Sequence, residues 1–284
     1  MSERHAIERR LRALAEVGEI MASMKTLALL EAHRLTRRLD HQRRVVAGIL
    51  TAADDFRRHF LLPAAPAQGR QTYLVLGSER GFCGGFNQEL RQDLAGRVRT
   101  GAGPAPLVVA VGRRLWTGWE GSLARPAATL PGPIAGEEAE AALTRVLDVL
   151  DGLQQTHGPL VLTVLHHGEH PTETRATRLL PPFPDPPAGP AHTSPPHLNL
   201  APVELLPALV EHYLLARLFE LLYTSLVAEN QRRAEHLDGA LHRLERHGGA
   251  LTVRRNACRQ EEITEEIEII LLGAEDSRRP RRLT

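Results

Sequence analysis

The sequence predicts an α/β protein in which a long antiparallel two-helix coiled coil, formed by the two ends of the chain, accompanies a central Rossmann-like α/β domain. Three observations support this prediction. Apolar residues recur in steps of three and four near both ends of the chain, which is the spacing of a coiled-coil seam. Short apolar runs separated by Gly and Pro fill the middle. Aromatic residues make up only 4% of the chain, which favours helices packed through aliphatic side chains.

Residues 1–62 are predicted to form the first long helix. No proline occurs before Pro63, so nothing in the segment interrupts a helix. The apolar seam consists of Ile7, Leu11, Leu14, Met21, Ala28, Ala32, Leu35, Leu39, Val46, Ile49, Ala53, Phe56 and Phe60. Gly18, Lys25 and Gln42 fall on the same seam. A seam of this length has to be buried against a second helix or a partner.

Residues 63–202 are predicted to form the globular α/β domain. Apolar runs at 72–76, 107–111 and 160–165 are typical of buried strands, and helical stretches near 86–98 and 137–155 lie between them. Alternating strands and helices favour an α/β sheet. The proline-dense stretch from Pro181 to Pro202 is expected to be an exposed connector.

Residues 203–275 are predicted to form the second long helix, followed by a basic tail at 276–284. Its seam consists of Leu205, Leu209, Ala216, Phe219, Tyr223, Leu226, Leu237, Ala240, Leu244, Leu251 and Cys258. Asn230, Arg233 and Arg254 interrupt it. The two helices can bury their seams against each other, which predicts the antiparallel coiled coil.

Composition excludes several classes of protein. The net charge of +1 gives little support to nucleic-acid binding. No window is apolar enough to cross a bilayer, so we expect any membrane association to go through partners. The start of the chain lacks the features of a secretory signal, which predicts a cytosolic location. The two cysteines, Cys83 and Cys258, are too few for a disulfide framework and do not suggest a zinc site.

Two motifs could hold a ligand, and for each a structural role is favoured. The segment Ser78–Asn87 (SERGFCGGFN) follows a predicted strand and precedes a helix, where backbone amides can cradle a phosphate. Its glycines fit neither the P-loop nor the dinucleotide-binding spacing, so a tight turn with Cys83 buried in it is preferred over a nucleophilic cysteine. His166–His170 (HHGEH) offers metal ligands, but a solvated hairpin between two β segments is preferred. The prediction is therefore no metal and no cofactor.

Three motifs resemble the gamma subunit of F-type ATP synthases. Glu19–Ala32 (EIMASMKTLALLEA) is similar to that family's signature around a Met-Lys or Met-Glu pair. Ser78–Asn87 resembles its DRGLCGGxN turn, with Glu for Asp and Phe for Leu. Ala228–Ala274 resembles the family's carboxyl-terminal helix without a gap and retains its RQxxITxE core. The resemblance covers nearly the whole chain.

The resemblance implies a non-catalytic central-stalk rotor. Its terminal helices would turn inside a hexamer of alpha and beta subunits, while the α/β domain would contact the epsilon subunit and the membrane c-ring. The complex would lie on the cytoplasmic side of the cell inner membrane. For contact with a beta subunit the resemblance implies Arg259, Gln260, Thr264, Met24 and Lys25. For the turn motif it implies Arg80, Gly81, Cys83, Gly84, Gly85 and Asn87, and for the c-ring foot Asn199.

Departures from the family pattern mark a divergent member. The family's Tyr-Glu-Pro segment before the second helix reads Leu198-Asn199-Leu200 here, and the basic tail extends past the usual end. These changes suggest a second-copy enzyme, with protons and sodium both open as the coupling ion. Two alternatives stay open: a non-rotary coiled-coil adaptor derived from the same fold, and an enzyme that binds nucleotide through the turn at residues 78–87.

Overall fold

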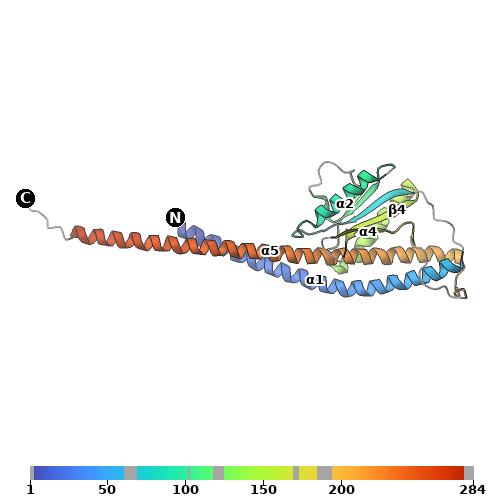
Figure 1. Ribbon diagram of the computed structural model, residues 1–284, viewed down its shortest axis with the longest axis horizontal. Coiled ribbons are helices and arrows are strands. Elements are labelled where there is room, and N and C mark those ends of the chain that lie inside the picture. Colours follow the sequence, from blue (N-terminus) through green and yellow to red (C-terminus); the bar gives the residue numbers. More distant parts are fainter. Residues whose placement is uncertain are drawn as a thin grey trace, which may run out of the picture. The chain divides into compact units, whose positions relative to one another are not determined.

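The computed structural model describes residues 3–60, 69–101, 103–117, 125–168, 173–183 and 194–277. The chain forms two compact units, one from residues 1–25 with 237–284 and one from residues 26–236. We call them the terminal-helix unit and the sheet unit. Helices α1 (Glu3–His59) and α5 (Pro202–Ser277) contribute to both (Figure 1). The two predicted long helices are confirmed.

The terminal-helix unit pairs the beginning of α1 with the later part of α5. Arg4 Nη1 lies 3.3 Å from Glu262 Oε2, and Lys25 Nζ lies 2.5 Å from Asp238 Oδ1. Residue numbers rise along α1 as they fall along α5, so the pair is antiparallel, as predicted. Between these two ion pairs the helices are close enough that a Cβ added at Gly18 would make ordinary van der Waals contact with Leu244, at 3.5 Å.

The sheet unit is built on a five-stranded sheet with the order β3-β2-β1-β4-β5. The strands are β1 (Arg70–Leu76), β2 (Leu107–Val111), β3 (Ala128–Leu130), β4 (Leu160–His167) and β5 (Thr174–Arg178). β1 pairs in parallel with β2 and β4, β2 pairs in parallel with β3, and β5 is antiparallel to β4. Continuous apolar runs such as LVVAV in β2 suit strands that are covered on both faces.

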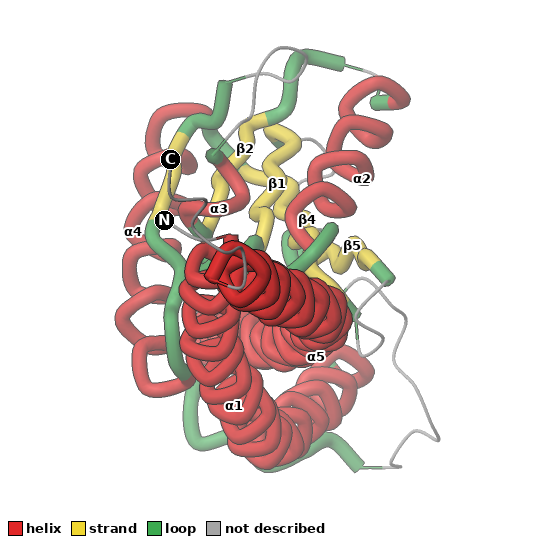
Figure 2. The backbone as a smooth tube through the Cα atoms, turned by 90° about the vertical axis from the view of Figure 1, so that its left-hand side faces the viewer, coloured by secondary structure: helices red, strands yellow, loops and turns green. Residues whose placement is uncertain are grey.

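Helices cover both faces of the sheet (Figure 2). On one face α2 (Phe86–Thr100) and α3 (Arg113–Trp116) pack against β1 and β2. On the other, α4 (Ala139–His157) shares a core with α5 and Leu35 of α1. The 3-10 helix η1 (Gly136–Glu138) leads into α4. This is the Rossmann-like arrangement that the alternating pattern predicted, with α5 built into the domain's core.

The seam predicted for α1 is the buried face of the helix. Its fully buried members are Ile7, Ala28, Ala32, Leu35, Leu39, Val46, Ala53 and Phe56. Gln42, a polar residue on the seam, donates a hydrogen bond from Nε2 to the carbonyl of Ala216 at 2.9 Å. A polar seam residue therefore finds a backbone partner on α5 and does not break the packing.

The structure differs from the sequence prediction at HHGEH and at β3. His166 and His167 belong to β4 and are buried, so the predicted solvated hairpin at HHGEH is wrong for these two residues; residues 169–172 lie outside the described ranges. β3 was not predicted, because a three-residue strand has too few residues to show a pattern. Of the proline-dense connector, residues 184–193 lie outside the described ranges and 194–201 form neither helix nor strand. The tail from 278 onward also lies outside them.

Candidate functional site

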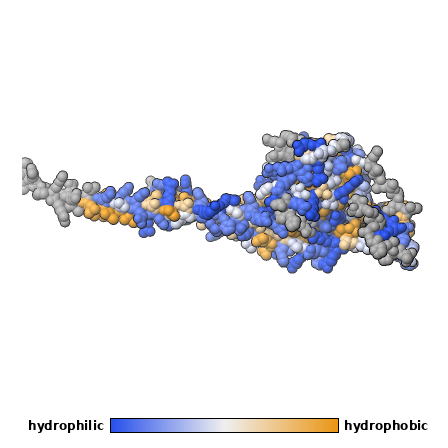
Figure 3. Space-filling model, viewed as in Figure 1, coloured by the Kyte–Doolittle hydropathy of each residue, from blue (hydrophilic) through white to orange (hydrophobic). Residues whose placement is uncertain are grey.

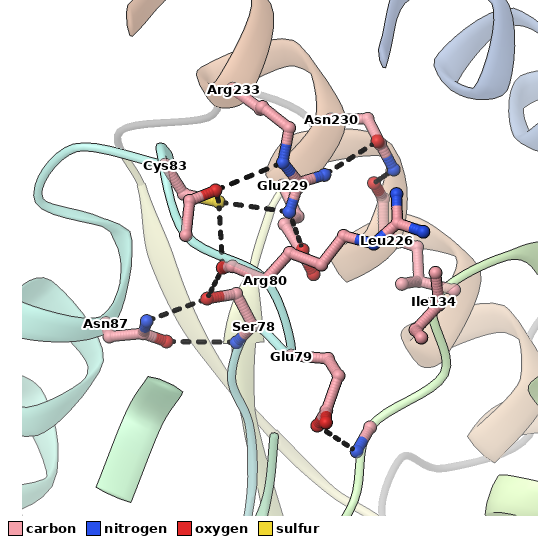
Figure 4. A network of polar contacts seen from close by, with 12 residues as sticks. Ser78, Glu79, Arg80, Cys83, Asn87, Ile134, Leu226, Glu229, Asn230 and Arg233 are labelled. Atoms are coloured by element: carbon pink, nitrogen blue, oxygen red, sulfur yellow. Dashed lines mark hydrogen bonds and ion pairs between the residues drawn. The ribbon is translucent and has the colours of Figure 1, made fainter. Parts of the chain in front are cut away.

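The turn between β1 and α2, residues 78–87, is closed by side-chain hydrogen bonds (Figure 4). Asn87 Oδ1 accepts from the backbone N–H of Ser78 at 2.9 Å, and Asn87 Nδ2 donates to Ser78 Oγ at 2.8 Å. The Ser78 hydroxyl donates in turn to the carbonyl of Arg80 at 3.0 Å. The predicted motif residue Asn87 therefore holds the first turn of α2 against the end of β1.

The backbone of this turn is left-handed at two positions. Gly84 has φ +56°, which glycine adopts without strain. Phe82 has φ 64° although it carries a side chain, and the residue is 52% exposed. Gly85 is the N-cap of α2 and makes no side-chain capping bond. The tight turn leaves the N-terminus of α2 without a protein side chain capping it.

A buried network joins the turn to α5 (Figure 4). Arg233 donates from Nε to the carbonyl of Gly81 at 3.2 Å and from Nη2 to Cys83 Sγ at 3.3 Å. Its guanidinium also bonds Asn230 Oδ1 at 2.9 Å and pairs with Glu229. Both members of the Glu229–Arg233 pair are buried. A buried ion pair is costly to break because the remaining charge has no partner.

These network residues explain the interrupted seam. Arg233 breaks the apolar pattern of α5 because it donates to the turn, and Asn230 accepts from the same guanidinium. The sequence showed that Asn230 and Arg233 interrupt the apolar seam, but it did not predict that they belong to a buried polar network, and it did not point to Glu229. The available signal for the network was the presence of polar residues at seam positions of an otherwise apolar helix face.

Protonation states in the network follow from burial. Burial raises the pKa of the Cys83 thiol to about 11, with the nearby Glu229 carboxylate acting in the same direction and Arg233 against it. Burial also raises the pKa of Glu229, although Arg233 opposes the shift. At neutral pH Cys83 is a thiol, which makes it a poor nucleophile. Where side chains are described, no group of three or more His, Cys, Asp or Glu is arranged to hold a metal ion.

Glu79, which stands where the resembled motif has Asp, ties the turn to two loops. Its Oε2 accepts from the backbone N–H of Arg113 at 3.0 Å and of Gly132 at 2.8 Å. Its Oε1 lies 2.8 Å from Arg113 Nε. The longer Glu side chain is therefore accommodated by partners beyond the ends of β2 and β3. The turn, β2 and β3 are held together at the same edge of the sheet.

The terminal-helix unit carries the residues that the sequence assigned to a beta subunit. Arg259, Gln260 and Thr264 are exposed on α5, and the Thr264 hydroxyl donates to the carbonyl of Gln260 at 2.9 Å. Met24 and Lys25 are half-buried on α1. Lys25 is engaged by Asp238, and this hydrogen bond lowers the pKa of the Asp238 carboxyl. The three α5 residues are exposed, whereas Lys25 has a partner within the unit.

Three exposed isoleucines lie on α5 in the same stretch as Arg259, Gln260 and Thr264. Ile263, Ile267 and Ile270 are 46%, 52% and 69% exposed. They lie beyond Glu262, the last α5 residue with an ion-pair partner on α1 among the described residues. Figure 3 shows hydrophobic residues gathered along these last described turns of α5. In the sheet unit Asn199, the predicted foot residue, is exposed in the segment that precedes α5.

Comparison with known proteins decides the family. A family model described as ATP synthase matches residues 3–276. The chain belongs to the gamma-subunit family of ATP synthases. The ATP synthase gamma chain of Saccharopolyspora erythraea is 25% identical over an alignment of 310 positions, which covers 97% of this chain and 97% of that one. The resemblance inferred from the three motifs is confirmed.

Solved structures share the fold of this gamma subunit. A chain of the Euglena gracilis mitochondrial ATP synthase, solved as OSCP, F1 and c-ring, matches with a TM-score of 0.61 at 13% identity and covers 99% of this chain and 98% of that one. A chain of the Tetrahymena thermophila central stalk and c-ring matches with a TM-score of 0.52 at 16% identity, covering 78% and 99%. As a gamma subunit, the protein is the central-stalk rotor subunit of an F-type ATP synthase. Every helix in the described ranges is too short or too polar to span a bilayer.

Proposed function

We propose that this gamma subunit couples ion flow through a membrane c-ring to ATP synthesis or hydrolysis in an alpha/beta hexamer, and that it contributes no catalytic residue. The family match over residues 3–276 carries the proposal, because it includes both terminal helices as well as the sheet. The exposed stripe of Ile263, Ile267 and Ile270 supports it. An apolar surface of this kind marks a site for a protein partner.

In the proposed mechanism the rotor acts as a ligand of the beta subunits, and the surface that it presents differs from one side of the helices to another. The exposed residues of α1 and α5 differ in sequence, so each beta subunit would meet a different surface at any one orientation. A ligand shifts a conformational equilibrium only by its differential affinity for the two states. Turning the rotor moves these preferences from one beta subunit to the next, while the chemistry stays in the beta subunits.

The proposed beta contact is the exposed face of Arg259, Gln260 and Thr264. The Arg259 guanidinium can bind a carboxylate through two parallel hydrogen bonds, a geometry that Lys cannot reproduce. Gln260 and Thr264 add neutral hydrogen bonds. Met24 and Lys25 would contribute from α1; the Asp238 contact holds Lys25 at a fixed position along the helix pair.

The proposed foot of the rotor is in the sheet unit. Asn199 lies exposed where the family places a carboxylate toward the c-ring, so this rotor would contact its ring without that charge. The epsilon subunit would bind the same unit. The subunit would thus be peripheral, on the cytoplasmic side of the cell inner membrane, and attached only through its partners.

Purification from cells that carry an affinity tag on this chain tests the proposal. We expect the alpha, beta, epsilon and c subunits to be recovered together with it. Replacing two exposed apolar residues, as in Ile267→Asp with Ile270→Asp, should lower recovery of alpha and beta several-fold. The matched control, Glu265→Ala with Glu266→Ala in the same turns, should not. Recovery of the tagged chain with soluble partners but without c subunits would favour the adaptor alternative.

A further inference from the structure

Two adjacent glycines, Gly248 and Gly249, lie inside the part of α5 that belongs to the terminal-helix unit. The helix continues through both of them. Glycine weakens a helix interior because it loses more backbone freedom on folding than any other residue. Relative to alanine, each glycine changes the equilibrium constant for helix formation by about fivefold. Two in succession therefore favour local opening of α5 by about twentyfold.

Close packing does not account for the two glycines. A Cβ added at either position would have nothing within 4 Å beyond the helix's own backbone and the adjacent residues. At Gly112, by contrast, a Cβ would lie 2.6 Å from the carbonyl oxygen of Gly77, so only glycine fits there. Alanine would fit at positions 248 and 249 without a clash and would favour the helix. What glycine provides at these positions is a helix that opens more easily.

Thr252 weakens the same turn of α5. Its hydroxyl donates to the carbonyl of Gly248 at 2.9 Å. A threonine hydroxyl bonded to the carbonyl four residues earlier slightly destabilises a helix and often bends it. The same contact joins Thr156 to Gly152 in α4, at 2.8 Å, where only one glycine is present. In α5 the contact and the glycine pair fall on one turn, so their effects coincide.

The weak turn lies between two points at which α5 is joined to α1. On one side Lys25 pairs with Asp238, and on the other Arg254 Nη2 lies 2.5 Å from Glu3 Oε1. Residues 239–253 of α5, all of which the structure describes, make no ion pair to α1 and include no fully buried residue. Opening of the turn therefore breaks no ion pair between the helices and exposes little apolar surface.

We propose that residues 248–252 of α5 form a flexible joint, a helical turn that opens and closes reversibly while the turns on either side stay helical. α1 has its own glycine in the facing span, where Gly18 lies opposite Leu244, so α1 can follow a bend of α5. When the joint opens, the segment that carries Arg259 tilts relative to the turns near Asp238. The joint is a property of the chain itself and does not depend on the proposed coupling function.

Hydrogen–deuterium exchange of the full-length chain, resolved to single amides by mass spectrometry, tests the proposal. After correction for intrinsic rates, we expect amides 249–252 to exchange faster than the amides on both sides, at 241–245 and 256–260. Such a maximum distinguishes a joint from fraying of the helix end, which would make exchange steadily faster toward residue 277. A steady rise without a maximum at 249–252 overturns the proposal.

Gly248→Ala with Gly249→Ala removes the weak point without creating a clash. Exchange of amides 249–252 should slow by about twentyfold, while exchange at 241–245 changes little. The matched control is Gly152→Ala in α4, which also has open space for a Cβ and a threonine hydroxyl on its carbonyl. This control should leave amides 249–252 unchanged.

Two results with the double alanine variant would also overturn the proposal. One is slowing of amides 249–252 by less than about threefold, which is below the effect of even one glycine. The other is equal slowing throughout the terminal-helix unit, which would show that the two alanines stabilise the unit as a whole and that the turn does not open by itself.

Discussion

At the scale of single residues, burial decides which side chains are chemically active. Cys83 lies between the Arg233 guanidinium and the carbonyls of Arg80 and Gly81. Its thiol has hydrogen-bond partners within the protein and is shielded from reagents in water. His166 is in a similar position inside β4, where both ring nitrogens have protein partners. Neither residue is available for catalysis, although both are residue types that often act in it.

The first prediction concerns cysteine reactivity. With a pKa of about 11, about one in a thousand Cys83 thiols is ionised at pH 8, and the side chain is buried. We expect iodoacetamide to modify the half-buried Cys258 first and Cys83 only after unfolding, as read by mass spectrometry of peptides. A Cys258→Ser control should leave the native protein almost unmodified. Equal rates at the two cysteines in the folded protein would contradict the buried network.

The second prediction concerns pH. His166 Nδ1 donates to the carbonyl of His167 at 2.8 Å, and Thr177 Oγ1 lies 3.1 Å from Nε2. Burial, with smaller contributions from Arg217, His167 and Arg175, lowers the pKa of His166 to about 4. A depressed histidine pKa means that the unfolded chain binds the proton first, so stability is full above about pH 6.5 and is lost as the pH falls toward 4.

Lowering the pH from 7.5 to 5 should therefore cost about 2 kcal/mol of unfolding free energy through this group. Urea denaturation at the two pH values measures it. His166→Gln keeps a polar side chain without the titration, and its loss over the same range should be smaller by about that amount. An identical pH dependence in the variant would show that His166 does not titrate as proposed.

At the scale of elements, α5, like α1, belongs to both units, and it supplies seam residues, sheet-covering residues and the Glu229–Arg233 pair. Removing one member of a buried pair leaves an uncompensated charge, which costs about 3 to 5 kcal/mol. Arg233→Ala should therefore destabilise the protein by that amount in urea denaturation. Glu229→Gln with Arg233→Met removes both charges and should cost less. The exposed Arg246→Ala should change stability by less than about 0.5 kcal/mol; a similarly small cost for Arg233→Ala would contradict the pairing.

A prediction about function also belongs to α5. Neutral hydrogen bonds contribute about 0.5 to 1.5 kcal/mol and charged ones about twice that. Arg259→Ala with Gln260→Ala should weaken the preference for one beta conformation by about 2 to 4 kcal/mol and slow cooperative ATP hydrolysis many-fold, without unfolding the helix. ATPase activity and ATP-driven ion pumping of the assembled complex measure the effect. Glu261→Ala is the neighbouring control, and wild-type rates in the assembled double variant would refute the assignment.

Periodic features of the elements could be predicted from sequence, and long-range polar contacts could not. The seam from Ile7 to Phe60 follows from local spacing, so its burial was predictable. Strands β1, β2 and β4 were recognisable from continuous apolar runs. The role of Arg233 depends on Gly81 and Cys83, about 150 positions away, and an arginine on a helix looks solvated until its partner is known.

At the scale of the whole molecule, the two units differ in what they leave exposed. The sheet unit buries its apolar strands between helices. The terminal-helix unit leaves polar and apolar residues of α5 uncovered, from Arg259 to Ile270. A partner that encloses the helices would bury the apolar stripe and meet the Arg259 face in the same contact. This division matches a rotor subunit whose helices act on the catalytic subunits.

Observation of single complexes tests the rotor assignment most directly. The alpha/beta hexamer is fixed to a surface, and a bead is attached to this chain through Arg99→Cys on α2, with Cys258→Ser to remove the half-buried native thiol. We predict that ATP turns the bead continuously in one direction and that rotation stops when ATP is withdrawn. A complex that hydrolyses ATP while the bead on this chain stays still, or moves without a preferred direction, would contradict the account.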